Sequence, residues 1–256
     1  MEKKNFGKQN FSGRPTLRSV SIEDLMFLSV ETVPELPSFD YLSADMQSIW
    51  KEKAQKLGEN NISTEEAYLK YAGITAEFGK VAAVAAGVIR QSDKDGAYYL
   101  ITSVYDGTDE SQILSNLSEL ADNFLQNSKN CLAGHGIRRQ DLPFCARRIV
   151  VNNLNPSKLQ WIGDRCIDTA DYWTFGDVNA ERQPANLIAR IVGVEAENDD
   201  YNYMSAAQNF HNNSDTLAER AHRKVITAAQ IFLRFRGLQQ IDAEHILRKS
   251  NDKQKD

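Results

Sequence analysis

The chain has 256 residues, of which 41% are hydrophobic and 25% are charged, enough for a sizeable core in a globular protein. No apolar run is long enough to span a membrane, and the first residues lack the apolar core of a signal peptide. The formal net charge of −5 excludes a protein that is basic as a whole, so any nucleic-acid binding must come from a local patch. The three cysteines lack metal or redox spacing and fit buried free thiols. We therefore expect a cytoplasmic protein with no membrane partner.

The N-terminal part of the chain predicts a flexible arm, a buried strand and a helical excursion. Residues 1–20 are polar and basic, which is typical of a solvated terminus; an arm that binds nucleic acid is the alternative. Residues 24–31 form an apolar run that ends on the carboxylate of Glu31, and two prolines follow. Between about residues 38 and 76, apolar residues at helical spacing and a capping signature at Ser63 predict two inserted helices.

The middle of the chain predicts a hairpin followed by a helix, a strand and another helix. Two apolar runs, 80–89 and 98–104, are joined by a polar turn and predict an antiparallel pair of strands. Asp109 is placed to cap an amphipathic helix. Residues 130–134 predict a short buried strand, and residues 142–151 predict a helix.

The last long helix is predicted from about residue 216 to residue 236, because apolar residues recur at helical spacing and Gly237 follows. We expect one main domain over residues 21–240 and a polar tail over residues 241–256. Strands that alternate with helices in this order predict an α/β fold with a mixed central sheet of about five strands flanked by helices. Ligands gather at the strand ends of such sheets, so Glu31 marks a candidate site.

Four stretches resemble one protein family. They are Phe27–Pro34, with a Phe-Leu-Ser-Val-Glu-Thr run, Gly134–Arg148, which begins Gly-His-Gly and ends in an arginine pair, Asp168–Asp177, and Val225–Gly237 in the last helix. In order and spacing they resemble the predicted 3′–5′ exonucleases related to the proofreading exonuclease domain of family B DNA polymerases, from about residue 24 to residue 237. The resemblance implies a ribonuclease H-like fold and identifies residues 21–240 with an exonuclease domain.

The resemblance also implies a catalytic site of the DEDD type, in which four carboxylates hold two divalent metal ions. Glu31 and Asp141 match two of those carboxylates. Ser29 and Lys224 stand where the other two aspartates belong, and Arg220 stands where a tyrosine usually orients the attacking water. The resemblance therefore covers the scaffold, while half of the catalytic carboxylates are replaced.

Charge arithmetic argues against two-metal chemistry at these positions. Two carboxylates, Glu31 and Asp141, face the ammonium group of Lys224, and a serine hydroxyl is a poor ligand for magnesium beside a carboxylate. We expect no cofactor; Mg²⁺ or Mn²⁺ would bind, through Glu31 and Asp141, only if a residual site exists. Our first hypothesis is that Lys224 forms an ion pair with Glu31 or Asp141 in place of a metal. The alternative is that Lys224 extends into solvent.

Basic residues near the inferred site suggest that the cleft binds phosphate directly. Arg138, Arg139 and Arg223 are the predicted nucleic-acid-binding residues, and Arg220, His222 and Lys224 lie nearby in the sequence. Such a protein would hold a nucleic-acid end without cutting it. The alternative is a solvated loop at 138–139 and helix charges that face away from the site.

Other candidates have a structural explanation that we prefer. Asp168 and Asp171 could complete a metal site, but aspartates at a helix start more often cap it. A packing role is expected for His135, which could otherwise act as a base. The aromatic side chains that could stack on bases, but are expected in the core, are Tyr172, Trp173 and Phe175. Arg147 and Arg148 are expected to anchor a helix to neighbouring carboxylates.

The sequence thus predicts a catalytically impaired relative of DNA-processing exonucleases, a pseudoenzyme, whose candidate partners are single-stranded nucleic acid or another protein. One alternative is an active 3′–5′ exonuclease with a weak one-metal site at Glu31, Asp141 and Asp168, which saturable metal binding would favour. The other is a protein-interaction scaffold with a vestigial cleft, which would bind neither metal nor nucleic acid. Whether the chain is an enzyme stays open between these hypotheses.

Overall fold

The computed structural model of the chain describes residues 19–57, 62–196, 210 and 215–249. The arm predicted over residues 1–20 lies outside this range except for its last two residues. The strands are β1 (Leu25–Pro34), β2 (Gly79–Gln91), β3 (Tyr98–Asp106), β4 (Cys131–Gly134), β5 (Cys166–Asp168) and β6 (Ile246–Arg248). The helices are α1 (Ala44–Lys56), α2 (Thr64–Tyr71), α3 (Glu110–Phe124), α4 (Asp141–Val151), α5 (Thr169–Trp173), α6 (Ala185–Ile191) and α8 (Asp215–Phe235).

The strands form one mixed sheet of six strands in the order β5-β4-β1-β2-β3-β6. β1, β2 and β3 pair antiparallel along the chain, whereas β4 pairs parallel with β1, β5 with β4, and β6 with β3. The central sheet is flanked by helices, which confirms the predicted α/β fold class and is consistent with its ribonuclease H-like form. None of the described helices has the length and apolar composition needed to cross a membrane.

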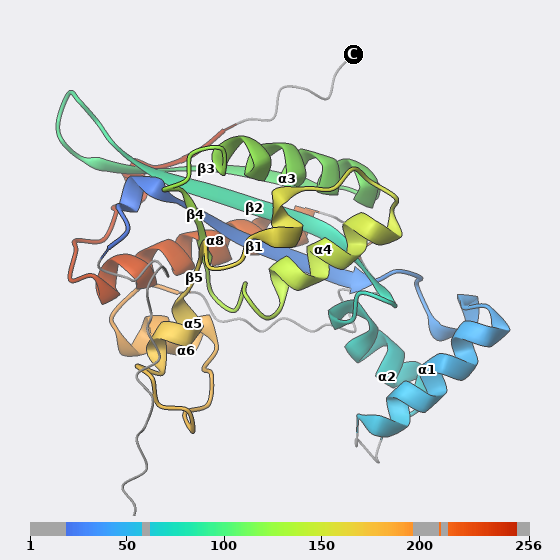
Figure 1. The fold of residues 1–256 in the computed structure, drawn as a ribbon. Coiled ribbons are helices and arrows are strands. Elements are labelled where there is room, and N and C mark those ends of the chain that lie inside the picture. Colours follow the sequence, from blue (N-terminus) through green and yellow to red (C-terminus); the bar gives the residue numbers. More distant parts are fainter. Residues whose placement is uncertain (1–18, 58–61, 197–209, 211–214, 250–256) are drawn as a thin grey trace, which may run out of the picture.

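The sheet is buried on both faces, and alternation along β1 shows how. Leu25 and Phe27 pack with the apolar side of α8 on one face, and the ring of Phe27 meets Phe232 edge-on at 5.7 Å. Met26 and Leu28 point to the opposite face, where α3 and α4 cover them (Figure 1). The inner residues predicted for the last helix are all buried; they are Ala218, Ala221, Val225, Ala228, Ala229, Phe232 and Leu233.

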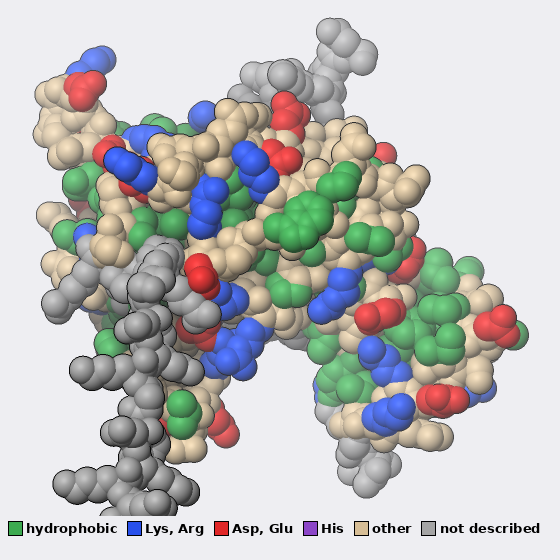
Figure 2. Space-filling view, viewed as in Figure 1, with side chains coloured by type: hydrophobic (Ala, Val, Ile, Leu, Met, Phe, Trp, Pro, Cys, Tyr) green, Lys and Arg blue, Asp and Glu red, His purple; other side chains and the backbone are tan. Residues whose placement is uncertain are grey.

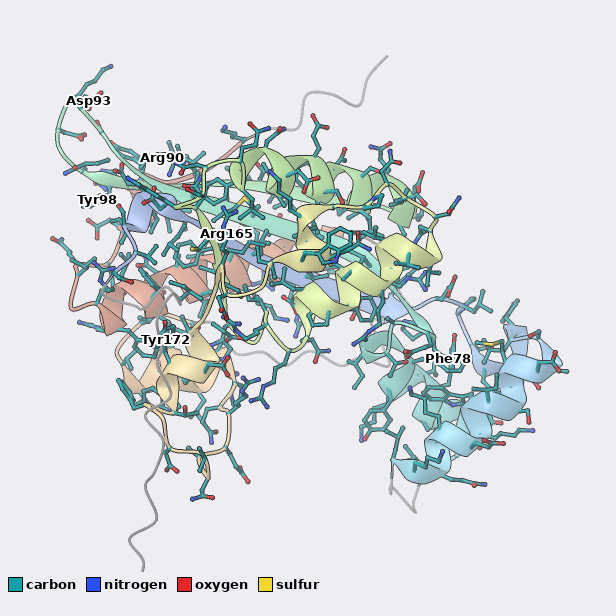
Figure 3. The ribbon with its side chains drawn as sticks, viewed as in Figure 1. Phe78, Arg90, Asp93, Tyr98, Arg165 and Tyr172 are labelled. Carbon is teal, nitrogen blue, oxygen red and sulfur yellow. The ribbon has the colours of Figure 1, made fainter. Side chains whose placement is uncertain are left out.

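The helical excursion after β1 has its own small core. Ser63 and Glu66 form the predicted capping box at the start of α2. Trp50 of α1 is fully buried and packs edge-on against Tyr68, with ring centroids 5.3 Å apart. Phe78 closes this cluster beside the start of β2, at the point where the two helices meet the sheet (Figure 3).

A buried ion pair ties α4 to α3 and to the excursion. The Arg148 guanidinium donates to Glu110, with Nη2 2.5 Å from Oε2, and to the carbonyl oxygen of Ala76 at 3.0 Å. Glu110 also accepts a 2.7 Å hydrogen bond from the Val81 amide. Arg148 is therefore the helix anchor that the sequence predicted, whereas its neighbour Arg147 is exposed.

Three local predictions differ from the structure. β1 continues three residues past Glu31 to Pro34, because Thr32–Pro34 still pair with the start of β2. β5 and β6 have three residues each, too few to give an alternating pattern in the sequence, so the sheet has six strands and not about five. β6 lies within the segment predicted as a polar tail, residues 241–256, and pairs with the outer edge of β3. The three cysteines are free and buried, as predicted.

Candidate functional site: a cationic cleft

A pocket of about 290 Å³ opens where β1, the start of α4, the start of α6 and one face of α8 meet. Its lining combines apolar side chains with a group of charged ones. The lining residues are Leu28, Ser29, Val30, His135, Asp141, Pro184, Ala185, Asn186, Ala196, Arg220, Arg223, Lys224 and Thr227. We call this pocket the cationic cleft. The structure thus brings together all five positions that the sequence aligned with the catalytic set, since Glu31 is paired with two of its lining side chains.

β1 supplies two of these positions from one face. Ser29 and Glu31 are two residues apart, so both side chains point toward α8, and both are buried. The pairing of β1 with β2 shifts by one residue between Glu31 and Thr32. Such bulges re-aim side chains locally. Glu31 therefore points off the sheet toward the helix at the place where the regular ladder breaks.

α8 supplies two cations to Glu31. Arg220 and Lys224 are four residues apart, so they lie on the same face of the helix, one turn apart. The Arg220 guanidinium pairs with Oε2 of Glu31, and Nζ of Lys224 lies 2.7 Å from Oε1. The ion pair predicted for Lys224 is therefore formed, and it is formed with Glu31. Arg220 and Glu31 are almost fully buried, whereas the Lys224 side chain is 37% exposed.

Asp141 begins α4 and faces the open edge of β1. β4 pairs with β1 only over Leu25–Phe27, and beyond that point the Val30 amide donates to Oδ2 of Asp141 at 3.2 Å. Burial raises the pKa of Asp141 to about 7; Lys224 opposes this shift and Glu31 adds to it. Near neutral pH this carboxyl group is therefore divided between its neutral and ionised forms.

His135 lies in the wall of the cleft, where both of its ring nitrogens form hydrogen bonds. Its Nδ1 lies 2.9 Å from Oγ1 of Thr169, and its Nε2 lies 2.9 Å from the carbonyl oxygen of Gln183. Burial lowers the pKa of His135, so the ring is neutral at physiological pH. Both ring nitrogens have partners in the protein, as expected of the packing role that the sequence predicted.

The balance of charge in the cleft is positive. Two carboxylates, Glu31 and Asp141, face three cations, Arg220, Arg223 and Lys224. Within the described residues, no group of three or more His, Cys, Asp or Glu side chains is placed to hold a metal ion. The donor set does not fit two divalent ions, because both oxygens of Glu31 already face cations and Ser29 offers a hydroxyl group where the resemblance implies a carboxylate.

Asp168 and Asp171 do not complete a carboxylate set. Asp168 caps α5, since its Oδ1 accepts from the amides of Ala170 at 3.0 Å and Gly136 at 2.8 Å, and its Oδ2 accepts from the Arg138 amide at 3.0 Å. This confirms the capping role preferred from the sequence. Asp171 instead pairs with arginine side chains from two other segments, outside the cleft lining.

The predicted nucleic-acid-binding residues divide between two places. Arg223 lines the cleft and is exposed. Arg138 and Arg139 lie in the turn before α4 and are not among the lining residues. The Arg138 guanidinium donates to the carbonyl oxygen of Cys166, so part of its hydrogen-bonding capacity is used within the protein.

The aromatic candidates do not line the cleft. Trp173 stacks on Phe235 with ring centroids 6.0 Å apart, and Tyr172, also in α5, packs against the main core (Figure 3). Both follow the packing role that the sequence predicted. For Phe175 that prediction is wrong, because it is 80% exposed, although its ring centroid lies 6.4 Å from that of Phe235.

Two features of the site were not anticipated from the sequence. The sequence marked Arg220 as a substituted position but gave no partner for it, since Glu31 is 189 residues away. The four-residue spacing of Arg220 and Lys224 on an amphipathic helix was the one available signal. Arg182, which pairs with Asp171, was not singled out, because a lone arginine in an irregular segment carries no local pattern.

Comparisons with known proteins leave the family open. No protein-family model matches the chain, and a search of curated proteins gives no match either. Among solved structures, the chain is similar to the family B DNA polymerase from the hyperthermophilic archaeon Pyrobaculum calidifontis, with a TM-score of 0.45 and 12% sequence identity. The match covers 83% of this chain but 24% of the polymerase, so the chain spans about a quarter of that protein. Nothing about the function of this chain follows from a similarity of this size.

Proposed function

We propose that this protein binds the end of a single-stranded nucleic acid in the cationic cleft, without a divalent metal ion and without cleaving the strand. The observation that carries the proposal is the position of Glu31 between Arg220 and Lys224. The family that the sequence resembles uses this glutamate to bind metal. Here two cationic side chains of the same protein form ion pairs with its two carboxylate oxygens.

Several contacts support a cleft that works without metal. A divalent ion at Glu31 would have to displace the ammonium group of Lys224, 2.7 Å from Oε1, and would lie beside the buried guanidinium of Arg220, where repulsion between cations is weakly screened. Asp141 is a weak substitute ligand, because its raised pKa leaves it partly protonated near pH 7. Two-metal hydrolysis depends on metal ions to stabilise the charge that develops during the reaction. We therefore expect neither saturable metal binding nor cleavage.

The same residues suit a phosphate group. Arg223 and Lys224 are the more exposed cations of the cleft, and guanidinium and ammonium groups contact phosphate oxygens directly. Apolar side chains such as Leu28 and Pro184 line the rest of the pocket and offer contact to a sugar or a base. A pocket of about 290 Å³ takes a group of nucleotide size and is too small for a duplex. A strand end is thus the nucleic-acid element that this cleft would hold.

The test measures strand binding and cleavage in the same preparation. Binding of a 12-nucleotide single strand labelled at its 5′ end is followed by fluorescence anisotropy in excess EDTA. We expect saturable binding that weakens several-fold in Arg223→Gln. The matched control is Lys94→Gln, which removes one charge at the tip of the β2–β3 turn beside Asp93, far from the cleft (Figure 3). Cleavage of the same strand is then measured with Mg²⁺ or Mn²⁺.

Each alternative function predicts its own result. An active exonuclease would shorten the strand with Mn²⁺, and Glu31→Gln would abolish that shortening. A scaffold with a vestigial cleft would bind no strand in any buffer. Either result would overturn the proposal, whereas metal-free binding without shortening would support it.

A further inference from the structure

A second group of cations lies beside the cleft. Arg138 and Arg139 come from the turn before α4, and Arg182 comes from the segment between α5 and α6. We call these three side chains the arginine triad. Figure 2 shows lysine and arginine side chains gathered on the surface between these two segments.

One carboxylate pairs with two members of the triad. Asp171 of α5 pairs with Arg182 through Oδ1 and lies 3.8 Å from Nε of Arg138 through Oδ2. Asp168, the other nearby carboxylate, is already saturated by three backbone amides. Burial lowers the pKa of Arg182, and repulsion from Arg139 and Arg138 lowers it further. Three guanidinium groups thus stand against two carboxylates, and only Asp171 forms ion pairs with them, which leaves an excess of positive charge at this surface.

The triad is continuous with the cleft. The carbonyl oxygen of Gln183, the residue after Arg182, lies 2.9 Å from the ring of His135 in the cleft wall. Pro184 and Ala185, the next residues along the chain, line the cleft itself. An anionic chain that leaves the cleft past His135 therefore meets the triad next.

We propose that the arginine triad is a second phosphate site, which receives the phosphodiester backbone of a strand whose end lies in the cleft. The inference rests on the proposed function and extends it from a strand end to a strand of several nucleotides. Arginine suits this role because its planar fork contacts two phosphate oxygens at once. Asp171 acts as the internal counter-ion of Arg138 and Arg182, with which a strand phosphate competes.

The experiment compares short and long strands in excess EDTA by fluorescence anisotropy. Arg139→Gln and Arg182→Gln, alone and together, are measured against Arg223→Gln in the cleft and Lys94→Gln as the distant control. We expect the triad variants to weaken binding of a 12-nucleotide strand several-fold while leaving a dinucleotide unaffected. The slope of log affinity against log salt should fall by about 0.7 for each phosphate group that a variant no longer neutralises, as for single strands generally. Arg223→Gln should weaken both lengths.

A further variant should bind the long strand more tightly instead of more weakly. Asp171→Asn removes the counter-ion, so it should tighten binding of the long strand and leave the dinucleotide unchanged. Arg139 is exposed, so Arg139→Gln tests the triad without disturbing packing; thermal unfolding checks that each variant is folded.

The outcomes separate the two proposals. Unchanged long-strand affinity and salt slope in both triad variants would overturn the second site while leaving strand-end binding in the cleft intact. An effect of the triad variants without any effect of Arg223→Gln would overturn the cleft as the place of the strand end. No binding by the unmodified chain to either strand would overturn both.

Discussion

At the scale of single residues, Glu31 is a buried carboxylate whose stability depends on two unequal partners. Arg220 is almost fully buried, whereas Lys224 is 37% exposed. Removing one partner of a buried ion pair leaves an uncompensated charge and costs about 3–5 kcal/mol. We therefore expect Arg220→Met to lower the free energy of unfolding by that amount. For Lys224→Met we expect about 1 kcal/mol, because solvent screens this pair. Urea unfolding near pH 7 measures both.

The control for these two variants is Arg223→Met on the same helix, an exposed position where a change within about 0.5 kcal/mol is expected. Adding Glu31→Gln to Arg220→Met should recover part of the loss, since it removes the unpaired charge. If Lys224→Met and Arg220→Met both unfold like the unmodified chain, the ion pairs do not hold the cleft together.

Asp141 makes the free energy of unfolding depend on pH, with a sign that follows from the direction of its pKa shift. Its pKa is raised to about 7, above the value of about 4 expected in the unfolded chain, so the folded protein binds this proton more tightly. Protonated Asp141 therefore contributes stability to the fold that is fully present below about pH 4 and is lost as the pH rises through about 7. We expect Asp141→Asn to remain neutral and to abolish this loss. The measured quantity is the unfolding free energy at pH 5 and pH 8.

His135 titrates in a neighbouring range and acts in the opposite direction. Its lowered pKa means that the unfolded chain binds this proton more tightly, so His135 contributes stability that is lost as the pH falls below about 6.5. Subtracting the pH profile of Asp141→Asn from that of the unmodified chain cancels this contribution. A difference that does not change between pH 5 and pH 8 would contradict the assignment to Asp141.

At the scale of secondary-structure elements, the Arg148–Glu110 pair joins α4, α3, β2 and the segment after α2. Arg148 and Glu110 are both buried, and the pair also satisfies the Val81 amide and the carbonyl oxygen of Ala76. We expect Arg148→Met to destabilise the fold by about 3–5 kcal/mol, because it leaves Glu110 charged and buried. Arg147→Met, on the exposed side of the same helix, is the control. Thermal and urea unfolding of the two variants should differ sharply, and equal stability would refute the anchoring role.

The elements that the sequence predicted are those with strong local signals. The last helix, the capping box at Ser63 and the β2–β3 hairpin each follow from residues within a few positions of one another. β5 and β6 were missed because three residues show no periodicity, and their pairing depends on partners far along the chain. The same limit applies to the site: a resemblance marked Ser29 and Lys224 as substituted positions, but the contact of Arg220 with Glu31 depends on the packing of α8 against β1.

At the scale of the whole molecule, we expect the charge of the cleft to decide whether this fold binds metal ions or an anionic strand. The chain carries a net charge of −5, yet the cleft has more cations than carboxylates. Its positive potential is therefore local. If the resemblance aligns the positions correctly, Ser29→Asp, Lys224→Asp and Arg220→Tyr in one variant place four carboxylates in the cleft. We expect this variant to bind Mn²⁺ saturably in calorimetric titration and to gain thermal stability from it.

The same variant should lose strand binding in EDTA, because its cleft has fewer cations to offer a phosphate group and its carboxylates would repel the strand. The unmodified chain should show the reverse: strand binding in EDTA and no stabilisation by Mn²⁺. Circular dichroism establishes that the variant is folded before the titration. A folded variant that binds no Mn²⁺ would show that the three positions do not converge on Glu31 and Asp141 as a metal site requires. The contrast with exonucleases would then lie in the shape of the cleft and not in its charge.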